Sequence, residues 1–384
     1  MGYDVSLVKC DSYDEGEVRS ALTEALDAIG GLDFVAPGMT VAIKTNLVSA
    51  MAPETAATTH PTMLSEIIKL LFERGAGKVI VGDSPGGLYN AAFVGRVYKA
   101  TGMRELEKVG ASLNDDFSQA ETEYKEGKVL RHFTYTAYLD KADAVIDFCK
   151  LKTHGMMGMS AAAKNMFGVI PGVMKPEYHY RFPKHEDFAD MIVDLDSFFP
   201  IKLCICDAVI GMEGNGPTMG TPRKIGAVIA SASPHALDLV AASLIGLTKD
   251  NVPTLKAAVN RNLIPADVSE LSVYGDPAQF YIPDFNNLPT PKSVEFKKES
   301  TKFFGKMSRL FMSSALRSKP TVKKKECIGC GVCKNICPAK AIVMENGKPV
   351  IDRKLCIRCF CCQEFCPKGA MKVSRTWIAK LLTK

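Results

Sequence analysis

The sequence predicts a large α/β domain with a mostly parallel or mixed sheet, followed by a small α+β module. Three observations support this fold class. Short apolar runs alternate with helix-like segments through the first 290 residues, which is the pattern of α/β domains. Nine of the thirteen cysteines lie between Cys327 and Cys366, so a separate cysteine-rich unit is expected there. A length of 384 residues suits one large domain with a small appendage.

The elements of the large domain are predicted from apolar runs and the residues that interrupt them. A buried strand is expected at 41–44, a helix at 62–74 that stops at Gly75, and another strand at 78–82. Further strands are expected at 144–148, 202–206 and 225–230, followed by an Ala/Leu-rich helix from about 234 to 247 and an irregular connection at 280–291.

The segment between the two units is basic. Apolar residues recur at helical spacing within 302–317, which indicates a short basic amphipathic helix that docks on its own protein, with a membrane-surface role as the alternative. Residues 319–325 are expected to link this helix to the cysteine-rich module. The predicted segments are therefore 1–300 (α/β domain), 301–325 (basic helix and linker), 326–376 (cysteine-rich module) and 377–384 (tail).

The composition is that of a soluble globular protein, with 47% apolar and 23% charged residues. No apolar run approaches the roughly 20 residues of a membrane span, and the first residues lack the basic and apolar regions of a secretory signal. We therefore expect a cytoplasmic protein. Its thiols would be kept reduced there, so a dense cysteine array indicates metal rather than disulfides.

Charge is distributed unevenly along the chain. The formal net charge is +6, but residues 301–384 hold 19 Lys/Arg against four acidic residues, while residues 1–300 have a net charge of −9. Such asymmetry indicates a charged partner. No nucleic-acid-binding module is recognisable. We therefore expect an acidic redox partner, such as ferredoxin or flavodoxin, or an interaction with the acidic half of the chain itself.

The cysteines form two runs with the same pattern, C-x2-C-x2-C-x3-C-P. The first run begins at Cys327 and the second at Cys356, 29 residues later. In such runs three thiolates bind one cluster and the fourth cysteine binds the other, so the pattern predicts a bacterial ferredoxin module with two [4Fe–4S] clusters. The predicted metal ligands are Cys327, Cys330, Cys333 and Cys366 for one cluster, and Cys356, Cys359, Cys362 and Cys337 for the other.

Two alternatives to this interpretation are zinc ribbons and disulfides. Zinc ribbons use pairs of cysteines rather than quartets that end in Cys-Pro, which favours the iron–sulfur clusters. Residues 341–344 and 370–373 follow the two runs at equivalent positions and are expected to be short strands. Cys361 lies between two predicted ligands and is assigned as a packed or partly exposed thiol.

Polar strings follow the predicted strands of the large domain, where open α/β sheets bind their ligands. They are 44–46, 83–87, 150–155, 164–168 and 207–218, with Asp207 opening a loop after its strand. Lysine and amide donors suit a carboxylate or phosphate, and the Gly214–Gly216 turn offers backbone N–H groups. The alternative is that each lysine is merely solvated and each glycine-rich turn is merely a turn.

Together these strings predict a site for a small anionic substrate. His154 is a candidate proton donor because its ordinary pKa lies near neutrality, although it is equally consistent with a structural histidine. We predict Lys152 and Lys164 as further catalytic residues. The predicted substrate-binding residues are Lys44, Asn46, Asn165, Asp207, Glu213 and Asn215.

Residues 175–187 contain His179, His185, Glu186 and Asp187, whose spacing matches no standard helix face for metal binding. We predict a mobile loop beside the site. Neither a G-x-G-x-x-G nor a Walker A motif opens a helix, which argues against nucleotide binding in those modes.

Five strings resemble the DUF362 family of iron–sulfur proteins in the family's order. They are IKTN, GDSPGG, KLKTHGMMGMSAAAKNMFGVIPG, DAVIGMEGNGPTMGTP and SPHALDLVAASLIG. The resemblance covers about residues 3–280, together with the ferredoxin module that many members carry. It implies a cytoplasmic protein of anaerobic metabolism with a redox role. The architecture also resembles the lactate racemase family more distantly, but no nickel-pincer signature is present to carry over.

Three functions follow from these observations. The leading hypothesis is a ferredoxin-type reductase, an oxidoreductase that passes single electrons through the clusters to an anionic substrate while His154 or a lysine supplies protons. No flavin motif is visible, so electrons would arrive one at a time. The second hypothesis is an electron-transfer adapter whose large domain binds a partner protein. The third is a non-redox enzyme whose clusters are structural or regulatory.

Overall fold

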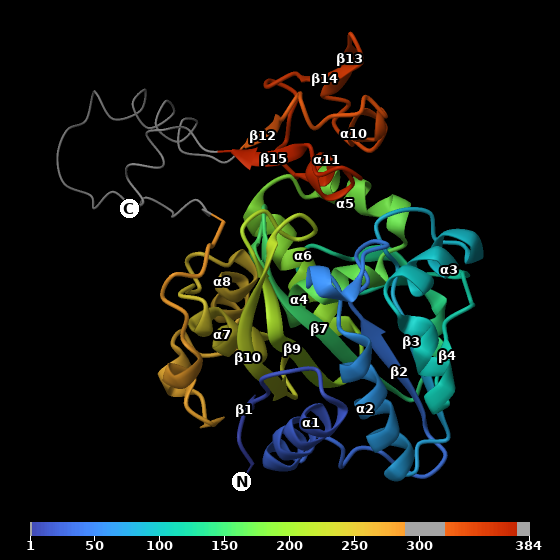
Figure 1. The fold of residues 1–384 in the computed structure, drawn as a ribbon, viewed down its shortest axis with the longest axis vertical. Helices are drawn as coiled ribbons and strands as arrows, with labels where there is room; N and C mark the ends of the chain where they lie inside the picture. Colours follow the sequence, from blue (N-terminus) through green and yellow to red (C-terminus); the bar gives the residue numbers. More distant parts are fainter. Residues whose placement is uncertain (1, 289–318, 375–384) are drawn as a thin grey trace, which may run out of the picture.

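A computed structural model describes residues 2–288 and 319–374 of the chain. It consists of a large α/β body with a small cysteine-rich module on one end (Figure 1). The predicted helix within 302–317 and the predicted tail at 377–384 lie outside the described residues.

The α/β body is built on a nine-stranded mixed sheet with the order β11-β1-β10-β9-β7-β2-β3-β4, and β8 pairs with β7. The strands β9, β7, β2, β3 and β4 run parallel, whereas β10 is antiparallel to its neighbours β1 and β9. This confirms the predicted fold class. The strands are Val5–Lys9 (β1), Thr40–Thr45 (β2), Lys78–Gly82 (β3), Ser112–Leu113 (β4), Ala144–His154 (β7), Gly158–Ser160 (β8), Ile201–Glu213 (β9), Thr221–Ser231 (β10) and Val273–Tyr274 (β11), with a separate hairpin of Gln119–Glu123 (β5) and His132–Thr136 (β6).

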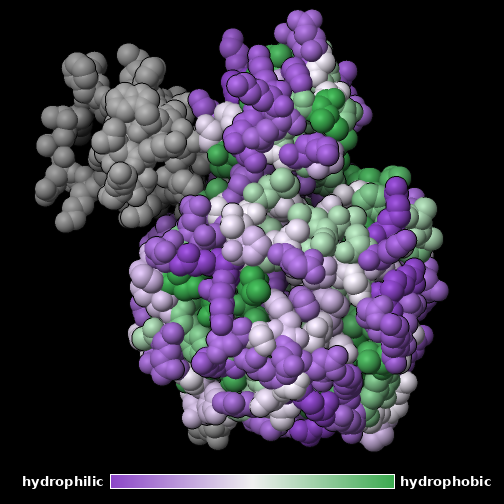
Figure 2. Space-filling model, in the orientation of Figure 1, coloured by the Kyte–Doolittle hydropathy of each residue, from purple (hydrophilic) through white to green (hydrophobic). Residues whose placement is uncertain are grey.

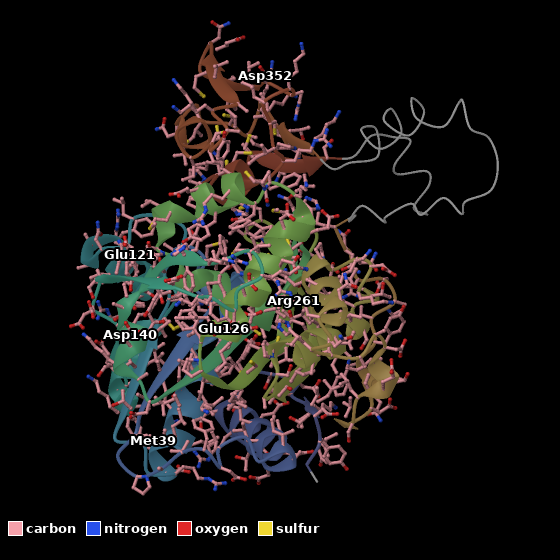
Figure 3. All side chains as sticks on the ribbon, turned by 180° about the vertical axis from the view of Figure 1, so that it is seen from behind. Met39, Glu121, Glu126, Asp140, Arg261 and Asp352 are labelled. Carbon is pink, nitrogen blue, oxygen red and sulfur yellow. The ribbon has the colours of Figure 1, made fainter. Side chains whose placement is uncertain are left out.

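Helices cover both faces of this sheet because its strands alternate apolar side chains between two cores. Ile43 packs with α1, α2 and α3 on one face, whereas its neighbour Ala42 packs with α6 on the other. Arg261, labelled in Figure 3, joins α8 to α6 by pairing with Asp190 and Asp194 at 2.8 and 2.7 Å. The helices are Glu15–Ile29 (α1), Pro61–Glu73 (α2), Ala91–Ala100 (α3), Ala162–Asn165 (α4), Lys175–Arg181 (α5), His185–Phe198 (α6), Pro234–Leu244 (α7) and Pro253–Asn260 (α8).

The expected strands of the large domain are present, but two of them are longer than predicted. β7 continues to His154 and β9 to Glu213. Both stay extended because each finds a hydrogen-bonding neighbour along its added length: β8 pairs with the end of β7, and β10 with the end of β9. Asp207 therefore lies inside a strand and does not open a loop, which corrects the prediction.

The segment around His179 is helical rather than a mobile loop. α5 begins at Lys175 with Pro176 in its first turn, where proline is tolerated because the first N–H groups of a helix lack partners. α6 begins at His185. The prediction of a loop was wrong because a helix of seven residues is too short to show an apolar period.

The cysteine-rich module contains two short antiparallel strand pairs, β12 with β15 and β13 with β14. β13 and β15 confirm the strands expected after the two cysteine runs. β12 falls in the segment predicted as a linker, and its pairing with β15 makes it part of the module. The elements are Lys319–Val322 (β12), Val332–Asn335 (α10), Ile342–Glu345 (β13), Lys348–Ile351 (β14), Cys361–Glu364 (α11) and Met371–Ser374 (β15).

The module docks on the α/β body through its second cysteine run. Phe360 is buried in the body's core beside Met156 and Met157. The Gln363 side chain donates hydrogen bonds of 3.1 Å to the carbonyls of Asn215 and Gly216. In Figure 1, α11 faces the body while α10 and the β13–β14 hairpin point away from it.

Candidate functional site

The chain reverses its winding direction between β2 and β7, which are neighbours in the sheet. From β2 the chain crosses through α2 to β3, whereas from β7 it crosses through α4 to α6 and returns at β9 on the opposite side. Ligands of open α/β sheets bind outside the carboxyl ends of the strands at such a switch point. The residues at the ends of β2 and β7 are therefore the first candidates for a site.

Four of the predicted residues meet at this point in one hydrogen-bonded network. Asn165 Oδ1 accepts from Lys44 Nζ at 3.2 Å and from Asn46 Nδ2 at 2.9 Å. Asn46 Oδ1 in turn accepts from Lys152 Nζ at 2.8 Å. The structure thus brings together Lys44, Asn46, Lys152 and Asn165, which lie up to 121 residues apart in the sequence.

Lys44 is neutralised inside this network. Its Nζ lies 2.9 Å from Asp83 Oδ1 and donates to the Thr45 carbonyl at 2.7 Å. Asp83 is held in place by the backbone N–H groups of Leu47 and Ser84. Gly168 allows this close packing, since a Cβ there would lie 2.4 Å from Asp83 Oδ1. The sequence analysis included Asp83 only within the polar string 83–87, and it did not predict the ion pair with Lys44.

Lys152 pairs with no carboxylate among the described residues. Its Nζ donates to Asn46 Oδ1 and to the Ala57 carbonyl at 2.6 Å, both of which are neutral oxygens. Burial, together with the charge of nearby Lys164, lowers the pKa of Lys152 to about 7. A lysine in this state can carry or release a proton near neutral pH.

Two more lysines near this network have no carboxylate partner in the described parts of the chain. The Lys164 ammonium is 4.6 Å from the centre of the Phe167 ring, and burial lowers its pKa. Lys175 Nζ donates to the Ser84 carbonyl, and burial lowers the pKa of Lys175 to about 7. Sequence reasoning found Lys164 but missed Lys175, because it placed that residue in a loop.

Asp207 forms a separate cluster with Lys150. Lys150 Nζ lies 2.8 Å from Asp207 Oδ2 and donates to the Tyr13 hydroxyl at 2.7 Å. The other Asp207 oxygen accepts from that hydroxyl at 2.9 Å, and the His60 ring stacks on Tyr13. Both charges of the pair are buried and neutralise each other. Asp207, predicted as a substrate-binding residue, therefore lies outside the lysine network.

His154 lies at the interface with the module. Its Nδ1 accepts the backbone N–H groups of Met156 and Met157 at 3.1 and 3.2 Å, so the ring carries its proton on Nε2. Nε2 lies 2.9 Å from Glu364 Oε1, close enough for an ion pair but not aligned as a hydrogen bond. Burial lowers the pKa of His154, which favours the neutral ring.

Glu213 and Asn215 also lie apart from the lysines. Glu213 Oε2 accepts the backbone N–H of Asn286 at 2.9 Å. Asn215 Oδ1 accepts the backbone N–H of Val373 in the module at 3.3 Å. Both residues hold chain segments in place, Glu213 within the body and Asn215 across the interface.

A buried carboxyl that sequence reasoning missed lies behind the network. Asp147 Oδ1 accepts from Asn165 Nδ2 at 2.5 Å, and its other oxygen has no partner among the described residues. Burial raises the pKa of Asp147 to about 7, which the nearby Lys44 opposes. The available signal was a single acidic residue inside the apolar run 144–148.

His179 is buried, and its ring stacks on Phe188 with 4.4 Å between the ring centres. Burial lowers the pKa of His179 to about 3. Among the described residues, no three His, Cys, Asp or Glu side chains converge closely enough to hold a single metal ion. The residues of 175–187 therefore contribute packing and, through Lys175, a cation.

The cysteine-rich module contains two small cavities. Each is lined by three cysteines of one run and the fourth cysteine of the other, and this crossed set of four thiols fits the ligand pattern of [4Fe–4S] clusters. Cys361 also lines the second cavity and is buried. The cavity-lining sets are Cys327, Cys330, Cys333 and Cys366 for the first, and Cys337, Cys356, Cys359 and Cys362 for the second.

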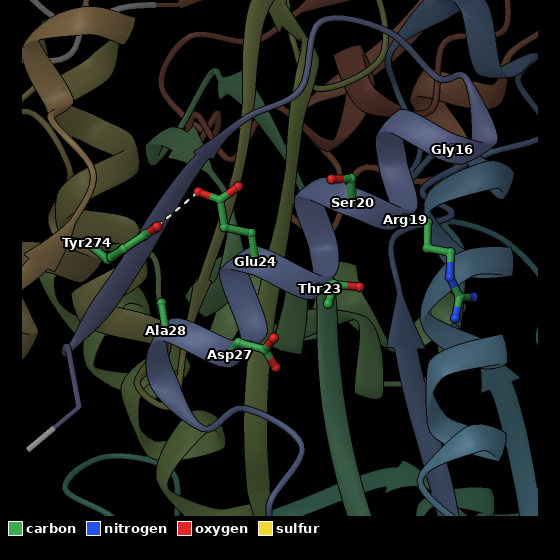
Figure 4. A pocket seen from close by; sticks show the side chains of 8 residues that line it. All are labelled: Gly16, Arg19, Ser20, Thr23, Glu24, Asp27, Ala28 and Tyr274. Atoms are coloured by element: carbon green, nitrogen blue, oxygen red, sulfur yellow. Dashed lines mark hydrogen bonds between the residues drawn. The ribbon is translucent and has the colours of Figure 1, made fainter.

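An open hollow on the α/β body lies along α1, beside Tyr274 (Figure 4). Its polar side chains bind one another or neighbouring helices: the Tyr274 hydroxyl donates to Glu24 at 3.1 Å, and Arg19 pairs with Glu73 at 2.6 Å. α1 is at the end of the body opposite the module (Figure 1). This hollow is therefore a surface feature remote from the lysine network.

Family comparisons match two parts of the chain. The DUF362 model, described as a domain of unknown function, matches residues 41–243, and the model of a 4Fe-4S dicluster domain matches residues 319–367. A thylakoid-associated protein of Synechocystis sp. is 31% identical over 273 residues, which cover 69% of this chain and 81% of the relative. None of the helices in the described parts of the chain is long and apolar enough to cross a membrane.

Two solved structures match part of this chain. The lactate racemase apoprotein from Thermoanaerobacterium thermosaccharolyticum is 12% identical over 62% of this chain and 57% of its own, with a TM-score of 0.39. A protein from Thermotoga maritima is 12% identical over 56% of this chain and 55% of its own, with a TM-score of 0.36. The match therefore spans little more than half of each solved structure.

Proposed function

The chain belongs to the DUF362 family and ends in a 4Fe-4S domain, and from this premise we propose that it is an iron–sulfur oxidoreductase acting on a small anionic substrate. One observation carries the proposal. The second cysteine run docks directly on the strand ends that hold the lysines without carboxylate partners, with Glu364 against His154 at 2.9 Å. Electrons leaving the module on this side would reach the network of Lys152.

The module is proposed to hold two [4Fe–4S] clusters, with the crossed ligand sets predicted from the sequence. The two cysteine-lined cavities support this count. Bound clusters would supply single electrons. The first cavity would be the outer site, because its run points away from the body (Figure 1), and the second would be the inner site beside His154.

An acidic one-electron carrier, such as a ferredoxin or flavodoxin, is the proposed donor. Residues 319–374 contain 12 Lys/Arg against four acidic residues, and Figure 2 shows hydrophilic side chains over much of the module's visible face. Ile328, next to Cys327, is 61% exposed and gives this basic surface an apolar contact point. Opposite charges would steer the donor to the outer site.

In the body, the lysines would bind the substrate and supply protons. A net reduction adds two electrons, one at a time from the one-electron donor, and two protons to the oxidised substrate. Lys152 is the proposed proton donor, because its pKa of about 7 places it between its charged and neutral forms. Lys164 would hold the anionic group, and Lys44, Asn46 and Asn165 would position Lys152.

The test is to reduce the protein under anaerobic conditions, add small acids, and monitor reoxidation through the visible absorbance of the clusters. We expect at least one small acid with a reducible double bond to reoxidise the protein, and Lys152→Met to abolish this without loss of cluster absorbance. Lys184→Met, at a side chain that is 76% exposed, is the matched control and should be unaffected. Reoxidation that is equally fast in Lys152→Met would refute the site.

An electron-transfer adapter is the second candidate, favoured by exposed apolar side chains on the body close to the site. Leu88 is 56% exposed and Val173 is 53% exposed. Their segments touch, since a Cβ on Gly172 would lie 2.1 Å from the Gly87 carbonyl. A protein acceptor could dock there. Reoxidation by an electron-carrier protein but by no small acid would favour this function.

A further inference from the structure

Three lysines near the switch point have no carboxylate partner among the residues that the structure describes. We propose that Lys152, Lys164 and Lys175 bind a small dianion whose two negative charges lie on oxygen, as in a dicarboxylate or a phosphomonoester. The inference rests on the proposed function, because it names the substrate class of the same site.

The first support is the number of N–H donors that have no oxygen acceptor. Lys152 uses two of its three N–H groups and Lys175 uses one. Among the described residues, Lys164 contacts the Phe167 ring but donates to no oxygen, and none of the three lysines lies within 4 Å of a carboxylate. Six N–H groups of the three lysines therefore have no acceptor among the described residues and are free to donate to a ligand.

The second support is the balance of charge. The charged groups that act on these lysines include Lys44 from β2, Asp83 after β3 and Glu364 from the module. When all four lysines are protonated, four ammonium groups face the two carboxylates, which gives an excess of two positive charges. Lys150 also acts on Lys152, but Asp207 neutralises it. A dianion would balance the excess, whereas a monoanion would leave one charge without a partner.

The third support is access. Lys152 is fully buried, but Lys164 and Lys175 keep part of their surface exposed. The apolar ring of Phe167 beside Lys164 excludes water from one side of the contact, which strengthens a charge-assisted hydrogen bond.

Binding of a dianion is coupled to protons. Burial lowers the pKa values of Lys152 and Lys175 to about 7, so both lysines lose protons as the pH rises above neutrality. A dianion favours the charged lysines, so its binding takes up protons and weakens as the pH rises. Burial lowers the pKa values of His154 and His179, so both rings stay neutral in this range, whereas Asp147, with a pKa of about 7, adds to the uptake.

The experiment is anaerobic titration calorimetry of the full cluster-loaded chain with succinate, inorganic phosphate and acetate as probes. We expect succinate or phosphate to bind at least about tenfold more tightly than acetate, and the tighter of the two distinguishes a dicarboxylate site from a phosphate site. Repeating the titration in two buffers of different ionisation enthalpy should reveal proton uptake. Equal affinities for acetate and both dianions, or no binding of either dianion, would overturn the proposal.

Variants test the same site independently. Lys164→Met removes one charge but keeps the length of the side chain, and should weaken dianion binding about tenfold or more while acetate binding changes less. Lys184→Met should leave all three affinities unchanged. If Lys164→Met leaves dianion binding unchanged, the dianion binds at a different site. Dianion binding, together with no reoxidation of the reduced clusters by any small acid that has a reducible double bond, would refute the proposed reductase and leave this site standing.

Discussion

Two lysines only two residues apart on β7 are buried in opposite ways. Lys150 lies 2.8 Å from Asp207 and donates to the Tyr13 hydroxyl, so its charge is neutralised within the fold. Lys152 is equally buried but donates only to a side-chain amide oxygen and a backbone carbonyl. The same strand therefore carries one cation that is paired and one that is not.

The difference separates structural from functional charge. A buried ion pair satisfies itself and requires no ligand, although removing one partner is costly. A buried cation without a carboxylate lowers stability, because its desolvation is not offset by an opposite charge. Residues of this second kind are characteristic of functional sites, where stability is given up for chemistry. On this basis we assign Lys152, Lys164 and Lys175 to the proposed site and Lys150 to the scaffold.

The largest effect is expected from breaking the structural pair. Asp207→Asn leaves the Lys150 ammonium buried without a counter-charge, and should lower the free energy of unfolding by about 3–5 kcal/mol. Chemical denaturation followed by circular dichroism measures this loss.

The control is the double variant Lys150→Met/Asp207→Leu, which removes both charges. It should recover most of the stability, because no unpaired charge remains. A loss below about 1 kcal/mol in Asp207→Asn would mean that the pair is not the scaffold element described here.

The functional lysine should respond in the opposite way. Lys152→Met removes a desolvated charge and should leave the free energy of unfolding unchanged within about 1 kcal/mol, or raise it. Substrate-dependent reoxidation should fall by about a hundredfold or more, because the proton donor is lost. Denaturation and stopped-flow absorbance on the same preparation measure the two quantities. A large stability loss with reoxidation intact would place Lys152 in the scaffold beside Lys150.

The sequence distinguished these two lysines only in part. Both stand in the same polar string, 150–155, and both were expected to follow a strand. Their difference depends on Asp207, which is 57 residues away and reaches Lys150 only through the parallel pairing of β7 with β9. Contacts of this range depend on register, and an apolar pattern does not encode which charged side chains will meet.

Features encoded by local spacing were predicted well. The apolar runs gave the strands of the mixed sheet, and the two cysteine runs gave the sets of thiols that line the two cavities. Lys175 was missed because its short helix has no readable period. Glu364 was missed as the partner of His154, because that contact exists only once the module is docked on the body.

The pH dependence of stability sharpens the comparison. Burial lowers the pKa of Lys152 from 10.5 to about 7, so between these values the unfolded chain binds more protons than the folded one. The free energy of unfolding should therefore rise with pH in this window, by up to ~1.4 kcal/mol per pH unit for such a lysine. Denaturation of the wild type and Lys152→Met from about pH 7 to about pH 9 measures the difference in slope. Identical slopes would mean that Lys152 keeps its charge in the fold.

The smallest effect is expected from surface lysines. Their charges are solvated by water, so they need neither a carboxylate partner, as Lys150 does, nor a ligand. Lys324 and Lys325 are exposed beside the first cysteine run. Lys324→Glu/Lys325→Glu should change the free energy of unfolding by less than about 1 kcal/mol, while slowing reduction by an acidic flavodoxin several-fold at low salt. Screening should remove that difference at about 1 M salt, where charges interact over only about 3 Å. Stopped-flow reduction at several ionic strengths measures this. A slowing that persists at high salt would mean that these lysines contact the donor directly instead of steering it.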